Sequence, residues 1–328
     1  VQAYNNRGNV KSQLKKFNEA LIDYEKAIQL KPNFAEAHNN KGIVLNENYK
    51  FKEAIESYTK AIEINPNINF LLGSLIFSKL NICDWEQYTE NINLINNKIS
   101  NNYPASTPWS FLHFSSSPDL QKKIAEIFIK IKYPHLNVSN SIMKKNKNKK
   151  IRLGYYSADF RNHATSYLIA NLFEEHDKEK FEIFAFSFGP NVEDKMKNRI
   201  KNSVDKFYDV SFKNDHEISS LSKDLEIDIA IDLMGFTEHN RFGIFLKRCA
   251  PIQVNYLGYA GTLGCKNIDY IIADKILIPE ENQKFYTEKI IYMPDTYQSN
   301  DAKKIISKKK FTRTEFGLPE NSFVLCCF

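Results

Sequence analysis

Residues 151–173 read IRLGYYSADFRNHATSYLIANLF, an apolar run and a helix-like run joined by a polar turn. The first run, IRLGYYS, is apolar on both faces, as expected of a parallel strand that helices cover. The second run, YLIANLF, follows the turn at once. The stretch therefore predicts a strand, a turn and a helix, with an acid, a base, an amide and small hydroxyls crowded into the turn. These turn residues are Asp159, Arg161, Asn162, His163, Thr165 and Ser166.

The same texture continues downstream, where short apolar, β-branched runs alternate with amphipathic helical stretches. Alternation at this spacing predicts a doubly wound α/β domain over residues 150–300. The further strand candidates are residues 181–188, 206–211, 227–236, 252–259, 269–274 and 289–294. Residues 311–328, FTRTEFGLPENSFVLCCF, predict a connector followed by the first strand of another α/β lobe.

Upstream of the predicted sheet, the sequence repeats with a period of 34 residues. Six positions match twice, namely Gly8 and Gly42, Phe17 and Phe51, Ala20 and Ala54, Tyr24 and Tyr58, Ala27 and Ala61, Pro32 and Pro66. Small residues let two helices pack closely, aromatics fill the space between them, and proline ends the second helix. The pattern resembles two tetratricopeptide repeats over residues 1–67. Because such repeats bury their flanks against neighbours, we expect further repeats upstream or a degenerate helical cap with a linker over residues 68–143.

The net charge of +6 comes from 45 basic and 39 acidic residues, and much of the excess lies in Lys144–Lys150 and Lys308–Lys310. Nucleic-acid binding would require basic residues interleaved with aromatics, so these runs are interpreted as solvated linkers. No apolar run approaches the roughly 18 residues of a membrane span. A valine at position 1 and an apolar run at the last residues lead us to expect a piece of a longer protein.

The five cysteines lie in apolar settings and form no CxxC pair. We therefore expect reduced, buried thiols and a cytoplasmic protein. These residues are Cys83, Cys249, Cys265, Cys326 and Cys327.

The polar turn lies where ligands bind in open α/β sheets, at the end of a strand and the start of a helix. Asp159 and His163 are candidates for a base, or for the partner that orients a hydroxyl nucleophile. The helix N-terminus at Thr165 and Ser166 offers backbone N–H groups to an anion such as a diphosphate. In the structural alternative, Asn162 or Thr165 caps the helix and Asp159 closes an Asx-turn. A metal site is poorly supported, because no further ligand lies nearby in sequence.

A glycine-rich stretch, LGYAGTLG at Leu257–Gly264, follows the fifth strand candidate. Its glycines are spaced GxxGxxG, which is not the dinucleotide fingerprint. Glycine still allows a ligand to approach the backbone closely. The alternative is a tight turn that serves only the fold.

The stretch IDIAID places Asp228 and Asp232 on one side of a strand. Their separation of roughly 13 Å is too large for paired-carboxylate hydrolysis. Asp228 is interpreted as a strand-entry residue, whereas Asp232 and Arg241 lie nearer the ligand end. Arg241 is otherwise interpreted as a surface ion-pair partner.

Four stretches in this order behind tetratricopeptide-like repeats resemble the O-GlcNAc transferase family, which includes the SPINDLY-type enzymes. They are IRLGYYSADFRNHATSYLI, DIAIDLMGFTEHNR, APIQVNYLGYAGTLG and DYIIAD. The resemblance covers nearly the whole chain and implies a GT-B glycosyltransferase with two Rossmann-like lobes. Such an enzyme transfers N-acetylglucosamine from UDP-GlcNAc, with inversion and without a metal or other cofactor, to Ser or Thr of a protein bound along the repeats.

The resemblance also implies roles for particular residues. The family's catalytic-loop Asp corresponds to Asp159 and its active-site His to His163. The residues that it implies for binding the donor are Thr165, Leu257, Gly258 and Arg241. Many members carry Pro where this chain has Ala164. The carboxy-terminal lobe, which in the family supplies most uridine contacts, is missing from the chain, so we expect no transfer by these 328 residues alone.

Two other functions remain open at this point. One is a protein O-fucosyltransferase that uses GDP-fucose, since the donor is chosen largely by the missing lobe. The other is a repeat-based interaction protein whose α/β lobe is not catalytic. An α/β hydrolase is not supported, because no GxSxG elbow occurs.

Overall fold

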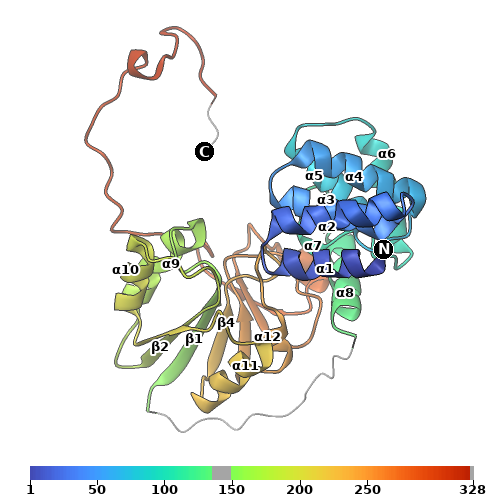
Figure 1. Cartoon of the computed structure of the whole chain (residues 1–328). Helices are drawn as coiled ribbons and strands as arrows, with labels where there is room; N and C mark the ends of the chain where they lie inside the picture. Colours follow the sequence, from blue (N-terminus) through green and yellow to red (C-terminus); the bar gives the residue numbers. More distant parts are fainter. Residues whose placement is uncertain (135–148, 326–328) are drawn as a thin grey trace.

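The computed structural model describes residues 1–134 and 149–325, in which a block of helices is followed by an α/β lobe (Figure 1). Four helices form the two repeats: α1 (Gln2–Gln13), α2 (Phe17–Leu30), α3 (Ala35–Glu47) and α4 (Phe51–Ile64). A Cβ at Gly8 would lie 2.6 Å from the Tyr24 ring, and one at Gly42 would lie 2.6 Å from the Tyr58 ring. The repeated glycine therefore makes room for the repeated tyrosine, which explains why these two positions keep the period.

Four further helices connect the repeats to the lobe: α5 (Leu71–Asn81), α6 (Tyr88–Ser100), α7 (Pro108–Leu112) and α8 (Pro118–Lys132). Helices α7 and α8 each begin with proline, and the hydroxyls of Thr107 and Ser117 cap them. On α8, Ile124 packs into the core of these four helices, whereas Ala125 and Ile129 join the core of the α/β lobe. Helix α8 thus fixes the helical block against the sheet.

The lobe contains a seven-stranded parallel sheet with the order β3-β2-β1-β4-β5-β6-β7. The strands are β1 (Ile151–Ser157), β2 (Phe181–Ser187), β3 (Lys206–Asp209), β4 (Ile229–Asp232), β5 (Ile252–Asn255), β6 (Tyr270–Ala273) and β7 (Lys289–Tyr292). The seven predicted strands and the doubly wound α/β class are confirmed. The strands predicted over 227–236 and 252–259 end earlier, at Asp232 and Asn255. Asp232 accepts the N–H groups of the next turn, which ends the ladder there.

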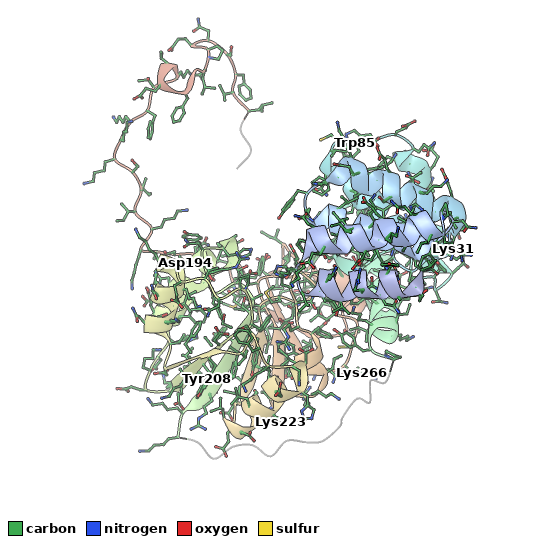
Figure 2. All side chains as sticks on the ribbon, in the orientation of Figure 1. Lys31, Trp85, Asp194, Tyr208, Lys223 and Lys266 are labelled. Atoms are coloured by element: carbon green, nitrogen blue, oxygen red, sulfur yellow. The ribbon has the colours of Figure 1, made fainter. Side chains whose placement is uncertain are left out.

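Helices cover both faces of the sheet. One face is covered by α9 (Ala164–Glu175) and α10 (Lys195–Ser203), whose apolar side chains pack against Leu153 and Tyr155. The other face, with Tyr156 and Phe186, packs against α8, α11 (Asp215–Asp224) and α12 (Gly243–Leu246). Figure 2 labels Asp194, before α10, and Lys223, in α11, at opposite ends of the lobe.

The segment after β7 first runs back over α9 and α10. Arg199 of α10 binds Glu174 and Asp301, and Lys303 binds Glu174 at 2.7 Å. The chain then extends away from the lobe (Figure 1). The strand predicted within 311–328 is absent from residues 311–325, where only a short 3₁₀ turn at Thr314–Phe316 forms. No neighbouring strand is present there to complete a ladder, and residues 326–328 lie outside the described part.

The cysteine prediction is correct for two residues and wrong for one. Cys249 and Cys265 are buried, but Cys83 is exposed. Cys83 lies in the turn between α5 and α6 with φ of 56°, and the turn directs it away from the core. Cys326, Cys327 and most of the Lys144–Lys150 run fall outside the described residues. Within residues 1–134 and 149–325, no helix has the length and apolar character needed to cross a bilayer.

Candidate functional site

Three loops meet at the carboxyl ends of β1, β4 and β5. The Ser157 hydroxyl, at the end of β1, donates to the Met234 sulfur at 3.4 Å. A side chain at Gly258, after β5, would overlap the carbonyl oxygen of Leu233. Strand order reverses between β1 and β4, which is the switch point where open α/β sheets bind ligands.

The turn after β1 holds Asp159 in a fixed position. Its side chain is buried, and its backbone N–H donates to the Ser157 hydroxyl at 2.9 Å. Its carbonyl oxygen accepts from the Arg161 N–H at 2.7 Å and from the Ser166 hydroxyl. The carboxylate accepts from the Arg161 guanidinium at 3.2 Å. The carboxylate is therefore held by one partly exposed cation and keeps acceptor capacity for another group.

His163 caps the N-terminus of α9, the helix that connects β1 to β2. Its Nδ1 accepts the Thr165 N–H at 3.3 Å and lies 3.5 Å from a carboxylate oxygen of Asp159. Accepting that N–H requires an unprotonated Nδ1, so the neutral ring carries its proton on Nε2. Protonation of Nδ1 would exchange the cap for an ion pair with Asp159. The alternative in which Asn162 or Thr165 caps this helix is therefore wrong, because the cap is His163.

The N-terminus of α9 lies beside this carboxylate. The Thr165 hydroxyl makes no hydrogen bond to another described residue, whereas the Asn162 N–H is taken by Asp194 at 2.8 Å. The helix has 12 residues, so its N-terminus carries the partial positive charge that favours an anion. An acid that can take a proton and a helix end that can bind an anion are therefore neighbours.

The glycine-rich stretch after β5 forms a tight loop. Leu257 has φ of 70°, in the left-handed region, and the approach of Gly258 to Leu233 allows no side chain. At the loop's far end, Glu288 accepts from the Thr262 hydroxyl and the Leu263 N–H, each at 2.7 Å. Glu288 is buried, and burial raises its pKa. The sequence analysis did not identify Glu288, because nothing near it in sequence marks it.

Arg241 is placed at the same edge of the sheet, but not against Asp159. Its guanidinium binds the Asp215 carboxylate, with Nε at 2.8 Å, and lies over the Phe188 ring. The ion-pair interpretation of Arg241 therefore describes what the structure shows. Of the two aspartates near β4, Asp228 accepts the Arg152 N–H at strand entry, and Asp232 is fully buried at the strand end.

Four residues that the sequence analysis did not single out border the site. The Lys15 ammonium, in the turn between α1 and α2, lies 3.3 Å from Nε2 of His239. Burial lowers the pKa of His239, and the charges of Glu238 and Lys15 act on it in opposite directions. Burial and the charge of Glu238 both raise the pKa of Glu47. The 34-residue period gives one signal for this region, because Tyr49 occupies the position in the second repeat that Lys15 occupies in the first.

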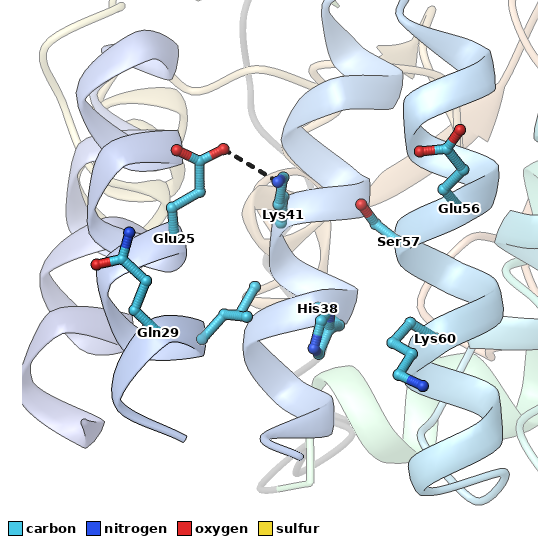
Figure 3. A pocket seen from close by; sticks show the side chains of 8 residues that line it. Glu25, Gln29, His38, Lys41, Glu56, Ser57 and Lys60 are labelled. Atoms are coloured by element: carbon cyan, nitrogen blue, oxygen red, sulfur yellow. Dashed lines mark hydrogen bonds and ion pairs between the residues drawn. The ribbon is translucent and has the colours of Figure 1, made fainter. Parts of the chain in front are cut away.

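A hollow lies on the repeats alone, between α2, α3 and α4. Figure 3 shows its side chains, among them Lys41, which binds Glu25 at 3.0 Å. Its volume is about 350 Å³. The charges of Lys41 and Glu25, which both line it, offset each other. None of the predicted site residues lines it, so it lies apart from the site at the sheet edge.

Comparison with known families gives two matches. A model of glycosyl transferase family 41 matches residues 82–314, and a tetratricopeptide repeat model matches residues 1–34 and 35–68. The first match covers more than half of the chain. The second falls on the helices that the 34-residue period predicted.

Curated relatives agree with these matches. The chain is 35% identical over 185 residues to a probable UDP-N-acetylglucosamine–peptide N-acetylglucosaminyltransferase, SEC, of Arabidopsis thaliana, covering 55% of this chain and 19% of the relative. It is 36% identical over 154 residues to the UDP-N-acetylglucosamine–peptide N-acetylglucosaminyltransferase of Caenorhabditis elegans, covering 46% of this chain and 13% of that protein. The SPINDLY protein of Arabidopsis thaliana is 29% identical over 150 residues, which is 45% of this chain and 16% of that protein. The chain thus spans about a fifth or less of these relatives.

Among solved structures, an O-GlcNAc transferase mutant of Thermobaculum terrenum is similar with a TM-score of 0.65. The superposition covers 90% of this chain and 58% of that one, at 21% sequence identity. At this identity the likeness concerns the fold. Helical repeats followed by a parallel α/β lobe are therefore an architecture that the two chains share.

Proposed function

The chain belongs to glycosyl transferase family 41, and from this we propose that it is part of a protein O-glycosyltransferase that transfers N-acetylglucosamine from UDP-GlcNAc to Ser or Thr of proteins. The observation that carries the proposal is the turn after β1. There the buried carboxylate of Asp159 lies beside the N-terminus of α9, at the switch point of the sheet. The names of the curated relatives support the same chemistry.

In the proposed reaction, the acceptor hydroxyl oxygen forms a bond to the anomeric carbon while the bond from that carbon to the diphosphate breaks. Asp159 takes or relays the hydroxyl proton, because its carboxylate has acceptor capacity beyond the Arg161 contact. The charge that develops on the diphosphate is stabilised by oriented N–H groups. At the N-terminus of α9 the Thr165 N–H already donates to His163, so the Ser166 N–H and the Thr165 hydroxyl, which no other described residue takes, are the groups assigned this role.

Other residues complete the donor side of the proposal. His163 holds the helix end through its Nδ1, which accepts the Thr165 N–H. The backbone at Leu257 and Gly258 lets the donor approach the sheet edge closely. Arg241 would contribute to donor binding only by sharing its guanidinium with Asp215. The proposal includes no metal ion or other cofactor, as the family resemblance leads us to expect.

The two alternatives keep specific support. Relatives of the SPINDLY type make a GDP-fucose donor worth testing beside UDP-GlcNAc, although the SPINDLY relative of Arabidopsis thaliana is itself named as a probable N-acetylglucosaminyltransferase. The repeats support a protein or peptide acceptor in either case. A non-catalytic interaction protein would use the repeats without the turn after β1.

The test uses the full-length protein that contains this chain, with labelled UDP-GlcNAc or GDP-fucose and an array of Ser- and Thr-containing peptides. We expect transfer from UDP-GlcNAc, and a decrease of about 10²–10⁴-fold in kcat/KM for Asp159→Asn with donor binding retained. Glu90→Gln, an exposed acid on α6, is the matched control. If only GDP-fucose supports transfer, the proposed donor is wrong and GDP-fucose takes its place. If Asp159→Asn transfers sugar as fast as the parent protein, the proposed catalytic role of Asp159 is wrong.

A further inference from the structure

A cavity of about 430 Å³ lies between the second repeat and the α/β lobe. It is bounded by the end of α3, the start of α4, the helix α5, residues 107–110 and the loop after β4. Aromatic side chains form much of its wall, including Tyr49, Phe51, Trp109 and Phe236. Its volume falls within the range of pockets that bind a small group or a side chain.

The loop after β4 connects the cavity with the proposed catalytic turn. Glu238 and Asn240 line it, and the residue between them is His239, on which the charges of Asp159 and Arg161 act. The Phe236 ring, in its wall, packs 5.4 Å from the Tyr259 ring of the glycine-rich loop. The cavity and the turn are therefore joined through residues of one loop.

The charge of the cavity is acidic. Two carboxylates, Glu47 and Glu238, lie at its exposed mouth, and no lysine or arginine is among the described residues that line it. Glu47 forms no ion pair with another described residue. The ammonium of Lys15 is close enough to affect Glu47, but its contact is with His239. The mouth thus carries negative charge that one nearby lysine offsets only in part.

Two of the aromatic rings form a corner. The rings of Tyr49 and Phe51 are 6.1 Å apart at an interplanar angle of 83°, and Glu47 lies two residues before Tyr49. Ring faces at right angles beside a carboxylate are the arrangement that binds an ammonium or guanidinium group through cation–π contacts. The Tyr49 side chain is 78% exposed and so is available for such a contact.

The backbone at this corner is strained. Tyr49 has φ of 58°, and Lys15, at the same position of the first repeat, has φ of 57°. Glycine takes this conformation without strain, whereas a large side chain does so at a cost of about 1–2 kcal/mol. In both turns the N–H of the next residue, Lys50 or Lys16, donates to a carbonyl oxygen of the preceding helix, so the left-handed residue closes that helix.

We propose that this cavity is a subsite for a lysine or arginine side chain of the acceptor protein, located within several residues of the hydroxyl that is modified. The inference rests on the proposed function in one respect, that the acceptor is a polypeptide. It adds a charge preference, carried by Glu47, Glu238 and the Tyr49–Phe51 corner.

The experiment measures peptide preference with the full-length protein. A peptide array keeps one Ser or Thr fixed and places Lys, norleucine or Glu at each neighbouring position in turn. Transfer is measured with UDP-GlcNAc, and binding of the same peptides is measured separately by fluorescence anisotropy without donor. The variants are Glu47→Lys with Glu238→Lys, Tyr49→Gly, and the control Glu90→Lys.

At one position we expect Lys to be favoured over norleucine by about tenfold, from cation–π and partly exposed ion-pair contacts together. The double charge reversal should switch this preference to Glu, and Tyr49→Gly should reduce it about threefold without lowering Tm. Equal use of Lys and norleucine, or a preference that the reversal leaves unchanged, would overturn the subsite. If no donor supports transfer, the proposed function fails, and the anisotropy assay then tests the subsite by itself. A binding preference that changes from Lys to Glu in the double variant supports the subsite, and an unchanged preference refutes it.

Discussion

The ammonium of Lys15 lies 3.3 Å from Nε2 of His239, although 224 residues separate them in the chain. An ammonium only donates, so Nε2 accepts and the ring is neutral with its proton on Nδ1. The contact joins the turn of the first repeat to the loop after β4, which also borders Asp159. The repeats and the site at the sheet edge are therefore electrostatically coupled.

Replacing Lys15 by Met should raise the pKa of His239. Burial lowers that pKa most, and the positive charge of Lys15 lowers it further, so removing the charge favours the imidazolium form. A titration of the histidine ring signals by NMR measures the effect. Lys16→Met, in the same turn, is the control, and an unchanged His239 titration would refute the contact.

The same shift predicts a pH dependence of stability. The pKa of His239 in the folded protein is below its ordinary value of 6.5, so the unfolded chain takes up the proton first. His239 therefore contributes to a loss of stability as pH falls below about 6.5. The measured quantity is the decrease in the free energy of urea unfolding from pH 7.5 to pH 5.5. This decrease should be smaller in Lys15→Met than in the parent protein. An equal loss in both proteins would argue against it.

Removal of the Glu288 carboxylate should loosen the glycine-rich loop. Glu288→Ala leaves the Thr262 hydroxyl and the Leu263 N–H without their buried acceptor, at a cost of about 2–4 kcal/mol of unfolding free energy. Hydrogen exchange of residues 262–264 should accelerate. Glu281→Ala, at an exposed acid on the 3₁₀ helix Glu280–Phe285, is the control and should change neither quantity. Equal behaviour of the two variants would mean that the carboxylate does not hold the loop.

Local patterns explain why so much of the fold could be predicted. The seven strands and the repeats depend on short-range periodicity and on spacing, both of which are written into neighbouring residues. The turn at Asp159 and the loop at Gly258 could be proposed as candidates for the same reason. Contacts such as those of Glu288 with Thr262, or of Lys15 with His239, depend on how distant elements dock. Exposure of Cys83 depends on a turn conformation that composition does not encode.

Cysteine reactivity should follow the structure. Burial raises the pKa of Cys249 and of Cys265 to about 12, so neither supplies a thiolate at neutral pH. Cys83 is exposed and should be alkylated by iodoacetamide first. The measurement is peptide mass spectrometry on a protein in which Cys326 and Cys327 are replaced by Ser. Modification of Cys249 before Cys83 in the native protein would contradict this order.

Asp232→Asn should remove a pH dependence of stability. Burial raises the pKa of Asp232 to about 6, even though the Met234 and Gly235 N–H groups favour its charged form. Because the folded pKa exceeds the unfolded one, stability from this group is present below about pH 4 and is lost as pH rises through about 6. The two N–H groups bind different carboxylate oxygens, so Asn, with one acceptor oxygen, loses one of these bonds at either pH. Relative to the parent protein, the variant should therefore gain about 1–3 kcal/mol of unfolding free energy between pH 4 and pH 7.5. Urea unfolding at both pH values tests this, and a variant that compares less favourably at pH 7.5 than at pH 4 would reverse the sign.

The last prediction concerns the close approach of two loops at the sheet edge. In Gly258→Ala the new methyl group meets the carbonyl oxygen of Leu233, which is backbone and cannot rotate away. In Gly154→Ala the methyl meets side-chain atoms instead, and the nearest, Ile227 Cγ2, is 3.0 Å away, compared with 2.0 Å for the Leu233 oxygen. Gly258→Ala should therefore cost about 1–3 kcal/mol more than this control and displace the loop. Because the loop is proposed to hold the donor, UDP-GlcNAc binding by the full-length protein should weaken by more than the stability loss alone explains. Calorimetric binding below the unfolding temperature separates the two effects, and wild-type affinity in a folded Gly258→Ala protein would remove this loop from the donor site.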